Sequence, residues 1–417
     1  TMKKTYLIIA ATALTALSAC TKNEVRSISD EPSQITWQTV IGPKSTKALV
    51  EGTKFSTDYN FKTYAFYNAN GTTWPNEASL YIDNAEVEYH EITGAAGTTG
   101  SKYWGTKQQY YWPKGGSLTF FAYTIIDSDK NIDSDKKATT YPANVSCTAD
   151  KGLEVTGYDV DANKNLDFMV ADIKSGQTAN TTSSHEGVET GVPTMFRHTL
   201  TQITGFNVKT AGEYKKVENN VILAESYVVT IKEIKIVNAF TTGNYQLKNS
   251  VDPRKETWSN QTNVRDKNNP YVYTVPNGNS AELNGSSYVS LANDQKAFLP
   301  QEFAKVDYTY TGKTALAKAR ERRTQAYIEK LKKVPYIEFS YSVSYYGKDD
   351  QKSFTDDATD YIALEELNGT GGYAWGINKK ITYNVIINLA GDNGEMVIYW
   401  DPTVKEWEEE EITGGLS

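Results

Sequence analysis

The chain is acidic and rich in aromatic residues. It has 417 residues, with 43 Lys and Arg against 51 Asp and Glu, a formal net charge of -8 and two cysteines. This length is enough for two domains, and so few cysteines exclude a disulfide-stapled miniprotein. The lack of a basic domain argues against nucleic acid as a partner, because phosphate binding needs concentrated Lys and Arg. The chain holds 29 Tyr but only 3 His, a bias toward residues that suit pleated sheets.

Residues 1–19 have the pattern of an export signal. Two lysines precede an apolar stretch, Tyr6 to Leu17, which is too short to span a bilayer as a helix. Small residues then precede Cys20, which resembles the bacterial lipobox, where the cysteine becomes the lipidated first residue. An ordinary secretory signal that ends near a chance cysteine is the alternative. We expect residues 20–34 to form a polar tether between lipid and fold, which leaves Cys147 as a free thiol.

Strand patterns begin directly after this tether. Ile35 to Ile41 alternates, with Ile35, Trp37 and Ile41 on one face and Val40 on the other. Further aromatic and β-branched runs bounded by Gly, Pro, Asn or Asp occupy residues 61–67 and 118–123.

Strand patterns continue in the second half of the chain. Apolar residues occupy every second position over residues 337–345 and again over 381–389, which predicts strands with one buried face. Between Val229 and Val237 the apolar phase shifts near Lys232-Glu233. This shift predicts either a β-bulge or a strand that is partly covered on both faces.

Many short strands with turn-rich connections predict an all-β chain of two tandem antiparallel β-sandwiches. The segment 174–192 is rich in Ser, Thr, Gly and Asn, so we place the division between residues 35–185 and 186–417. One short surface helix is expected in the second domain, from Thr314 to Lys333, because this stretch lacks Gly and Pro. We expect it to be solvated, with a site for an anionic partner as the alternative.

No catalytic, cofactor or metal site is predicted. The three histidines, His90, His185 and His198, lie in no zinc motif, and His198 falls in an expected strand, where a packed or hydrogen-bonded structural histidine is the default. The sequence also selects no carboxylate pair for glycoside hydrolysis, whose spacing is set in three dimensions.

Two other kinds of motif match a ligand-binding pattern only in part. The segments that start at Asp127 and Asp159 open like calcium loops but lack the glycine at the sixth position and the glutamate at the twelfth, so we expect turns. Gly369 to Ala374 matches a loose dinucleotide pattern without the strand and helix that the mechanism needs, so we expect a loop.

Aromatic residues are concentrated between residues 74 and 112. They could stack on sugar rings, but hydrophobic filling of a sandwich is the expected role of most. Trp74, beside Pro75 in an expected turn, is the candidate for an exposed, ligand-contacting ring. The set consists of Trp74, Tyr103, Trp104, Tyr110, Tyr111 and Trp112.

A series of short motifs resembles the fimbrillin family, the lipoprotein-derived pilins and adhesins of Bacteroidales-type bacteria. The motifs fall in the family's order and span nearly the whole chain after the signal. They are Tyr110 to Tyr123, Leu166 to Ala171, Phe196 to Leu200, Phe298 to Gln301 and Trp400 to Trp407.

The resemblance implies two transthyretin-like sandwiches, an outer-membrane lipoprotein precursor and assembly into a cell-surface fimbrium with other subunits. In the scheme that the resemblance implies, a trypsin-like protease removes the first strand together with the lipid. This exposes a hydrophobic groove, which a strand from another subunit fills. Ile35 to Ile41 is then the removable strand. The family often has Arg-Ala at the cut, whereas this chain offers Lys47-Ala48, with Arg26 as an upstream fallback. Adhesion to a host or bacterial surface ligand, without enzymatic activity, is the implied role.

Two alternatives remain at this point. One is a permanently lipidated fimbrial anchor or glycan-binding lipoprotein that does not polymerise, and the other is an enzyme acting on glycans or peptides. The run Glu408 to Glu411 and the tail that follows could be a solvated end or a donor strand.

Overall fold

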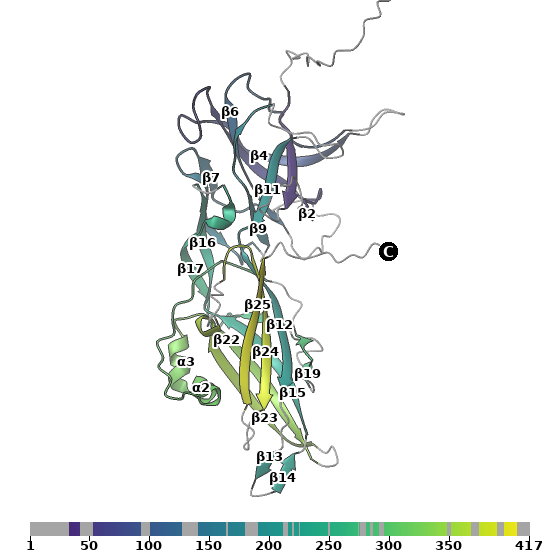
Figure 1. Cartoon of the computed structure of the whole chain (residues 1–417), viewed down its shortest axis with the longest axis vertical. Coiled ribbons are helices and arrows are strands. Elements are labelled where there is room, and N and C mark those ends of the chain that lie inside the picture. Colours follow the sequence, from purple (N-terminus) through teal and green to yellow (C-terminus); the bar gives the residue numbers. More distant parts are fainter. Residues whose placement is uncertain are drawn as a thin grey trace, which may run out of the picture.

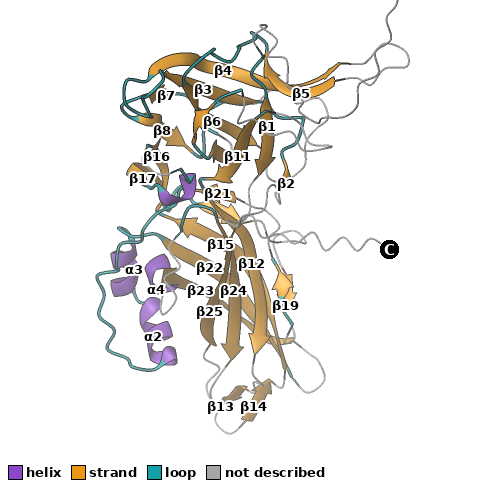
Figure 2. Cartoon of the chain, turned by 45° about the horizontal axis from the view of Figure 1, so that its top comes forward, coloured by secondary structure: helices purple, strands orange, loops and turns teal. Residues whose placement is uncertain are grey.

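The computed structural model describes residues 33–41, 53–92, 101–126, 141–163, 166–179, 191–211, 216–218, 221–224, 226–248, 251–273, 275, 281–283, 287–291, 296–347, 352–367, 375–389 and 396–406. Strands dominate this part of the chain, and its helices are few and short, as Figure 2 shows. The chain is therefore all-β, as predicted. Its sheets form an N-terminal unit and a C-terminal sandwich, which occupy opposite ends of an elongated molecule (Figure 1).

The N-terminal unit is built around a nine-stranded sheet. Its strand order is β10-β6-β3-β4-β5-β1-β11-β9, with β2 paired to β1. Because β9 also pairs with β6, the path from β6 to β9 closes on itself. The strands are β1 (Trp37–Ile41), β2 (Thr53–Lys54), β3 (Phe61–Asn68), β4 (Ser79–Ile92), β5 (Ser101–Thr106), β6 (Ser117–Ile126), β9 (Asp167–Ala171), β10 (Lys174–Gln177) and β11 (Val192–His198).

A four-stranded sheet covers one side of this closed sheet. Its order is β17-β16-β8-β7, formed by β7 (Val145–Thr148), β8 (Gly152–Asp159), β16 (Ala239–Leu247) and β17 (Trp258–Arg265). The two sheets share an aromatic core in which Phe168 packs against Tyr158, with ring centroids 5.2 Å apart, and against Trp258 at 6.3 Å. This is the layered packing expected of a sandwich.

Two five-stranded sheets form the C-terminal sandwich. In the first, β20 and β21 pair with β12, followed by β24 and β25, and β12 runs parallel to β24. In the second, β18 and β19 pair with β15, followed by β22 and β23. The strands are β12 (Thr201–Ala211), β15 (Ser226–Val237), β18 (Tyr271–Tyr273), β19 (Ala281–Leu283), β20 (Val289–Ser290), β21 (Lys296–Phe298), β22 (Tyr336–Tyr346), β23 (Lys352–Ala363), β24 (Lys379–Leu389) and β25 (Met396–Glu406).

The two alternating segments of the sequence form the centre of this sandwich. Every second residue of β22, from Ile337 to Tyr345, is buried in the core, and so are the alternate residues of β24 from Ile381 to Ile387. The register of β15 against β22 shifts between Ile231 and Glu233. The β-bulge and the one-sided burial of β24 are thus confirmed, whereas β22 also buries Ser342 and Ser344 on its other face, so it is covered on both sides.

The strand pairing crosses the division proposed at residue 185. β11 pairs with β1 and β9 in the closed sheet, and β16 pairs with β8. The part of the chain after residue 185 therefore contributes strands to both sheets of the N-terminal unit.

The expected single helix is two helices. α2 (Ala315–Arg322) and α3 (Gln325–Leu331) are capped by Thr314 and Thr324, whose hydroxyls accept from backbone N–H groups three residues later. Because Thr324 takes an extended conformation to make its cap, it breaks the helix that composition alone predicts to be continuous.

These helices are also less solvated than expected. Tyr327 and Leu331 are buried against Val237, Val334 and the end of β23. A third short helix, α4 (Leu364–Leu367), follows β23, and the 3-10 helix η1 (Pro253–Lys255) lies between β16 and β17.

A separate hairpin stands at the end of the C-terminal sandwich farthest from the N-terminal unit (Figure 1). It consists of β13 (Lys216–Glu218) and β14 (Val221–Ala224), which pair only with each other in the sheet topology. Among the described residues, no helix is both long and apolar enough to cross a membrane.

Candidate strand-exchange site

The first strand, β1, completes the closed sheet. It runs parallel to β11 over five residue pairs, from Trp37 opposite Val192 to Ile41 opposite Phe196. On its other side it meets β5 through one antiparallel pair, Trp37 with Trp104. Parallel pairing is slightly less stable per residue than antiparallel pairing. Most of the pairing that joins β1 to the sheet is therefore of the less stable, parallel kind.

The residues just before β1 extend this attachment. The Ile35 N–H donates to the Tyr110 carbonyl over 2.8 Å, and the Trp112 N–H donates to the Ser33 carbonyl over 3.0 Å. On the opposite side the Val192 N–H donates to the Thr36 carbonyl over 2.8 Å. The first segment thus forms backbone hydrogen bonds along both of its edges.

Two side chains anchor this segment in the core. Ile35 and Trp37 are both 0% exposed. The Trp37 ring makes edge-to-face contacts with Phe61, at 6.5 Å between centroids, and with Phe120, at 6.2 Å. We call the space that these two side chains fill, between β5 and β11, the β1 slot. Their shared buried face agrees with the alternation in the sequence, while the side chains of Val40 and Ile41 lie outside the described residues.

A glycine lets the chain approach β1 closely. A Cβ atom at Gly191 would lie 2.6 Å from the carbonyl carbon of Thr36 and 2.6 Å from that of Trp37. Both atoms belong to backbone, so no side-chain rotation could relieve the collision. Residue 191 must therefore be glycine for β11 to begin beside β1.

The far edge of β11 is fixed to β9 and the segment that follows it by a buried ion pair and a buried hydrogen bond. Arg197 binds Asp172 through two hydrogen bonds, 3.0 and 3.2 Å long. His198 Nδ1 lies 2.5 Å from the carboxylate of Asp167, whose side chain is fully buried. His198 is the structural histidine that its strand context predicted. Neither contact involves β1.

Trp74 is not the exposed aromatic that its turn position predicted. The turn folds back so that its half-buried ring packs on Phe66, at 5.1 Å, and Phe121, at 5.2 Å. Trp104 and Trp112 are buried as expected, whereas Tyr111 is 40% exposed. Composition could not distinguish these rings, because their exposure depends on which turns fold back onto the sheet.

The other predicted site residues lie outside the described part of the chain. These are Cys20, Arg26, Lys47, Ala48, His185 and the segments that start at Asp127, Gly369 and Glu408. Lys47 and Ala48 fall in the connection between β1 and β2, as the chain order alone requires.

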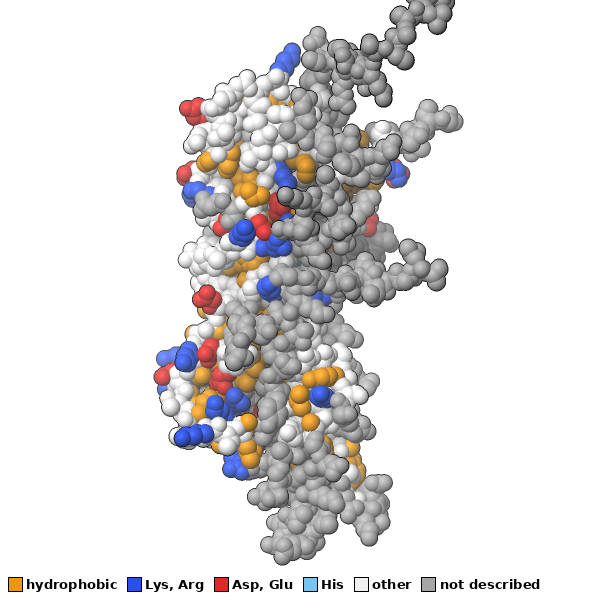
Figure 3. Space-filling view, in the orientation of Figure 1, with side chains coloured by type: hydrophobic (Ala, Val, Ile, Leu, Met, Phe, Trp, Pro, Cys, Tyr) orange, Lys and Arg blue, Asp and Glu red, His pale blue; other side chains and the backbone are white. Residues whose placement is uncertain are grey.

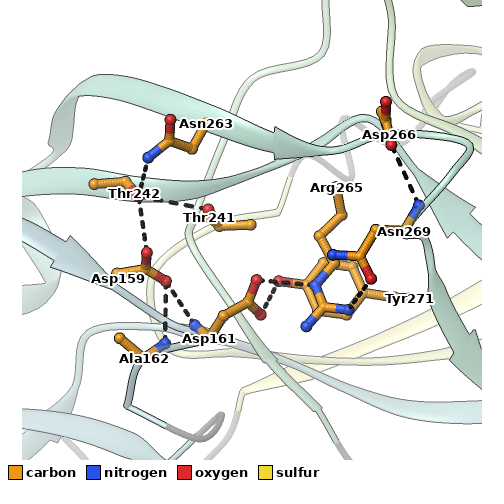
Figure 4. Close-up of polar contacts among 10 residues, drawn as sticks. All are labelled: Asp159, Asp161, Ala162, Thr241, Thr242, Asn263, Arg265, Asp266, Asn269 and Tyr271. Carbon is orange, nitrogen blue, oxygen red and sulfur yellow. Dashed lines mark hydrogen bonds and ion pairs between the residues drawn. The ribbon is translucent and has the colours of Figure 1, made fainter.

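The segment at Asp159 forms a turn, as predicted, and its carboxylates already have protein partners (Figure 4). Asp159 accepts from the backbone N–H groups of Asp161 and Ala162, over 2.9 and 3.2 Å. Asp161 accepts from Arg265 and from the Tyr271 hydroxyl, each over 2.9 Å. This network joins β17 of the N-terminal unit to β18 of the C-terminal sandwich, and no group of three potential metal ligands occurs within the described ranges.

The helices α2 and α3 carry mixed charge (Figure 3). Arg322 pairs with Glu366 over 2.8 Å, Arg323 with Asp360 over 2.8 Å and Lys330 with Asp307 over 2.9 Å. Since these cations already pair with carboxylates of the same chain, the arrangement favours a structural role over an anion site.

Comparisons place this geometry among known folds. No protein-family model and no curated protein matches the sequence. Among solved structures the chain is similar to a fimbrial protein from Bacteroides vulgatus ATCC 8482, at 15% identity and a TM-score of 0.51, over 90% of this chain and 99% of that one. The chain shares its fold with that fimbrial protein.

Two further solved structures match at lower TM-scores. One is a candidate cell adhesion protein from Bacteroides uniformis ATCC 8492, at 15% identity and a TM-score of 0.36, over 90% of this chain and 98% of that one. The other, from Parabacteroides distasonis ATCC 8503, has 10% identity and a TM-score of 0.37, over 89% and 97% of the two chains.

Proposed function

We propose that the chain is a structural subunit of a cell-surface fimbrium that serves adhesion. It is made as a precursor lipidated at Cys20 and held at the outer membrane. A protease cuts after Lys47, the segment carrying β1 leaves with the lipid, and a strand from another subunit takes its place. The fold shared with a Bacteroides fimbrial protein supports the class of function.

The position of β1 is the observation that carries this proposal. β1 completes the closed sheet and comes directly before the connection that contains Lys47. It is held by the side chains that fill the β1 slot and by pairing with β5, β11 and β2. One cut in that connection separates β1 and everything before it from the remaining strands. Its departure leaves an apolar slot and unpaired backbone groups on β5 and β11, which another strand can satisfy.

The test is the N-terminus of the protein recovered from the surface of its own cells, by intact mass and terminal peptide sequencing. We expect a chain that begins at Ala48 and a ladder of SDS-resistant species. A surface protein that begins at lipidated Cys20 and stays monomeric contradicts polymerisation and favours the permanently lipidated anchor.

A matched pair of variants tests the cut itself. We expect Lys47→Gln to abolish the Ala48 terminus and the ladder, because a trypsin-like protease needs a basic residue before the cut. Lys44→Gln removes a charge three residues earlier and is expected to leave both unchanged. Equal processing of the two variants contradicts the assignment of Lys47.

A further inference from the structure

We propose that the β1 slot is specific for one pattern in the strand that refills it. That strand has an aromatic ring at the position of Trp37 and an aliphatic side chain two residues before it. The occupant is an extended segment of another subunit with this aliphatic-x-aromatic pattern. The inference rests on the proposed function and names the feature by which its strand exchange is specific.

The contacts of Trp37 show what the slot accepts. Its ring touches Phe61 and Phe120 edge-on, while Phe61 also lies 5.8 Å from the Trp104 ring and 5.2 Å from Phe196. The two rings that contact Trp37 come from β3 and β6, and the two that support Phe61 come from β5 and β11, so the pocket is built by strands other than β1. An aliphatic side chain at this position would leave a void among rigid rings that cannot collapse.

Recognition at this pocket depends on the ring and not on its polar atom. Trp37 Nε1 is buried and has no hydrogen-bond partner in the part of the chain that the structure describes. A phenylalanine at the same place keeps the edge-to-face contacts and removes a buried donor that the slot leaves unsatisfied. The slot therefore accepts Phe as well as Trp.

Two side-chain contacts of β11 do not involve the occupant of the slot. The Arg197–Asp172 ion pair and the His198–Asp167 hydrogen bond hold the end of β11 at Arg197 and His198, on the side that faces away from β1. At the other end of β11, the Val192 N–H and the open face of Gly191 meet the strand in the slot. An occupant that reproduces these contacts runs parallel to β11, with its aromatic residue opposite Val192.

The test uses the full chain with a site for a sequence-specific protease inserted between β1 and β2. The protein folds intact, is cut only afterwards, and the cut segment is removed in mild denaturant, so the slot is empty and folding does not depend on the variant peptides. A fluorescent peptide of residues 33–41 is then added in excess, and its entry is followed by anisotropy and native mass spectrometry. Four peptides are compared: the natural sequence, Trp37→Phe, Trp37→Ala and, as a matched control at the half-buried neighbouring position, Gln38→Ala.

We expect the natural, Trp37→Phe and Gln38→Ala peptides to enter with affinities within about fivefold of one another. The Trp37→Ala peptide is expected to bind at least about 100-fold more weakly, because truncating a buried aromatic side chain leaves a cavity. Equal entry of the Trp37→Ala peptide overturns the aromatic anchor and leaves strand replacement intact. Failure of every peptide to enter overturns both the anchor and the strand replacement on which it rests.

Discussion

The ion pair between Arg197 and Asp172 contributes through its burial. Their side chains are 7% and 10% exposed, whereas those of Lys102 and Glu91, which pair between neighbouring strands, are each 57% exposed. Removing one partner of a buried pair leaves an uncompensated charge, while exposed pairs contribute little.

We therefore expect Asp172→Ala to lower the free energy of unfolding by about 3–5 kcal/mol. Glu91→Ala is expected to lower it by no more than about 1 kcal/mol. Urea denaturation of both variants measures the two changes. Similar values for the two would show that the Arg197 pair does not hold β11 as described.

Cys147 is expected to be chemically inert in the folded protein. Its thiol is buried in the core between the two N-terminal sheets, and burial together with the nearby Glu154 carboxylate raises its pKa well above the usual range. Because the thiolate is the reactive form, a Cys20→Ser protein at pH 8 should take up no thiol reagent when native and one equivalent when unfolded. Rapid labelling of the native protein would contradict this burial.

At the scale of elements, α2 is tied to the loop before it by Glu321. The carboxylate accepts from the backbone N–H of Gly312 over 2.6 Å and from that of Thr311 over 3.0 Å, and also from the Tyr308 hydroxyl. The Gly312 and Thr311 N–H groups lower the pKa of Glu321 below its ordinary value of 4.5. A carboxyl with a lowered folded pKa stabilises the fold above its unfolded pKa and loses that contribution as the pH falls through the folded value.

We expect Glu321→Gln to be less stable than the natural protein at pH 7, with a difference that disappears as the pH is lowered from 5 to 3. Urea midpoints measured across this range test the expectation. Glu302→Gln, at an exposed position, serves as the control and should follow the natural curve. A Glu321→Gln deficit that persists unchanged at pH 3 would rule out the charged carboxylate as its cause.

Local patterns in the sequence predicted the features that belong to a single element, whatever that element pairs with. The one-sided burial of β24 follows from alternation alone, and the bulge in β15 follows from a change of phase at Lys232 and Glu233. The break at Thr324 depends on a single hydroxyl that caps α3, which outweighs the helix propensity of the residues around it.

Non-local contacts were beyond the reach of the sequence pattern. Parallel pairing of β1 with β11 joins segments about 150 residues apart, and nothing in Ile35 to Ile41 specifies the direction of its neighbour. The alternation did predict that Ile35 and Trp37 face the core. It could not predict the aromatic pocket that receives Trp37, because the two rings that contact it, Phe61 and Phe120, come from β3 and β6.

At the scale of the whole molecule, the described chain passes between the N-terminal unit and the C-terminal sandwich three times. The passages are Thr199–Leu200 between β11 and β12, Asn238 between β15 and β16, and residues 266–270 between β17 and β18. Leu200 and Leu299 also belong to the core shared by the two N-terminal sheets. The N-terminal unit is thus completed by strands from the middle of the chain.

A fragment of residues 33–185 should therefore not fold on its own. It lacks β11, which pairs with β1 and β9, and also β16 and β17, which cover Tyr158 and Phe168. We expect no cooperative thermal transition for this fragment by circular dichroism, against a single transition for the chain from residue 33 onward. A sharp transition in the fragment would contradict the shared sheet.

The three passages bear on how the molecule responds to tension. Each is short, and the Asp161–Arg265–Tyr271 network bridges the last of them. A force along the long axis is shared by all three passages in parallel. None of them can therefore extend unless the other two extend as well. A molecule connected in this way is expected to resist extension at the junction between the N-terminal unit and the C-terminal sandwich.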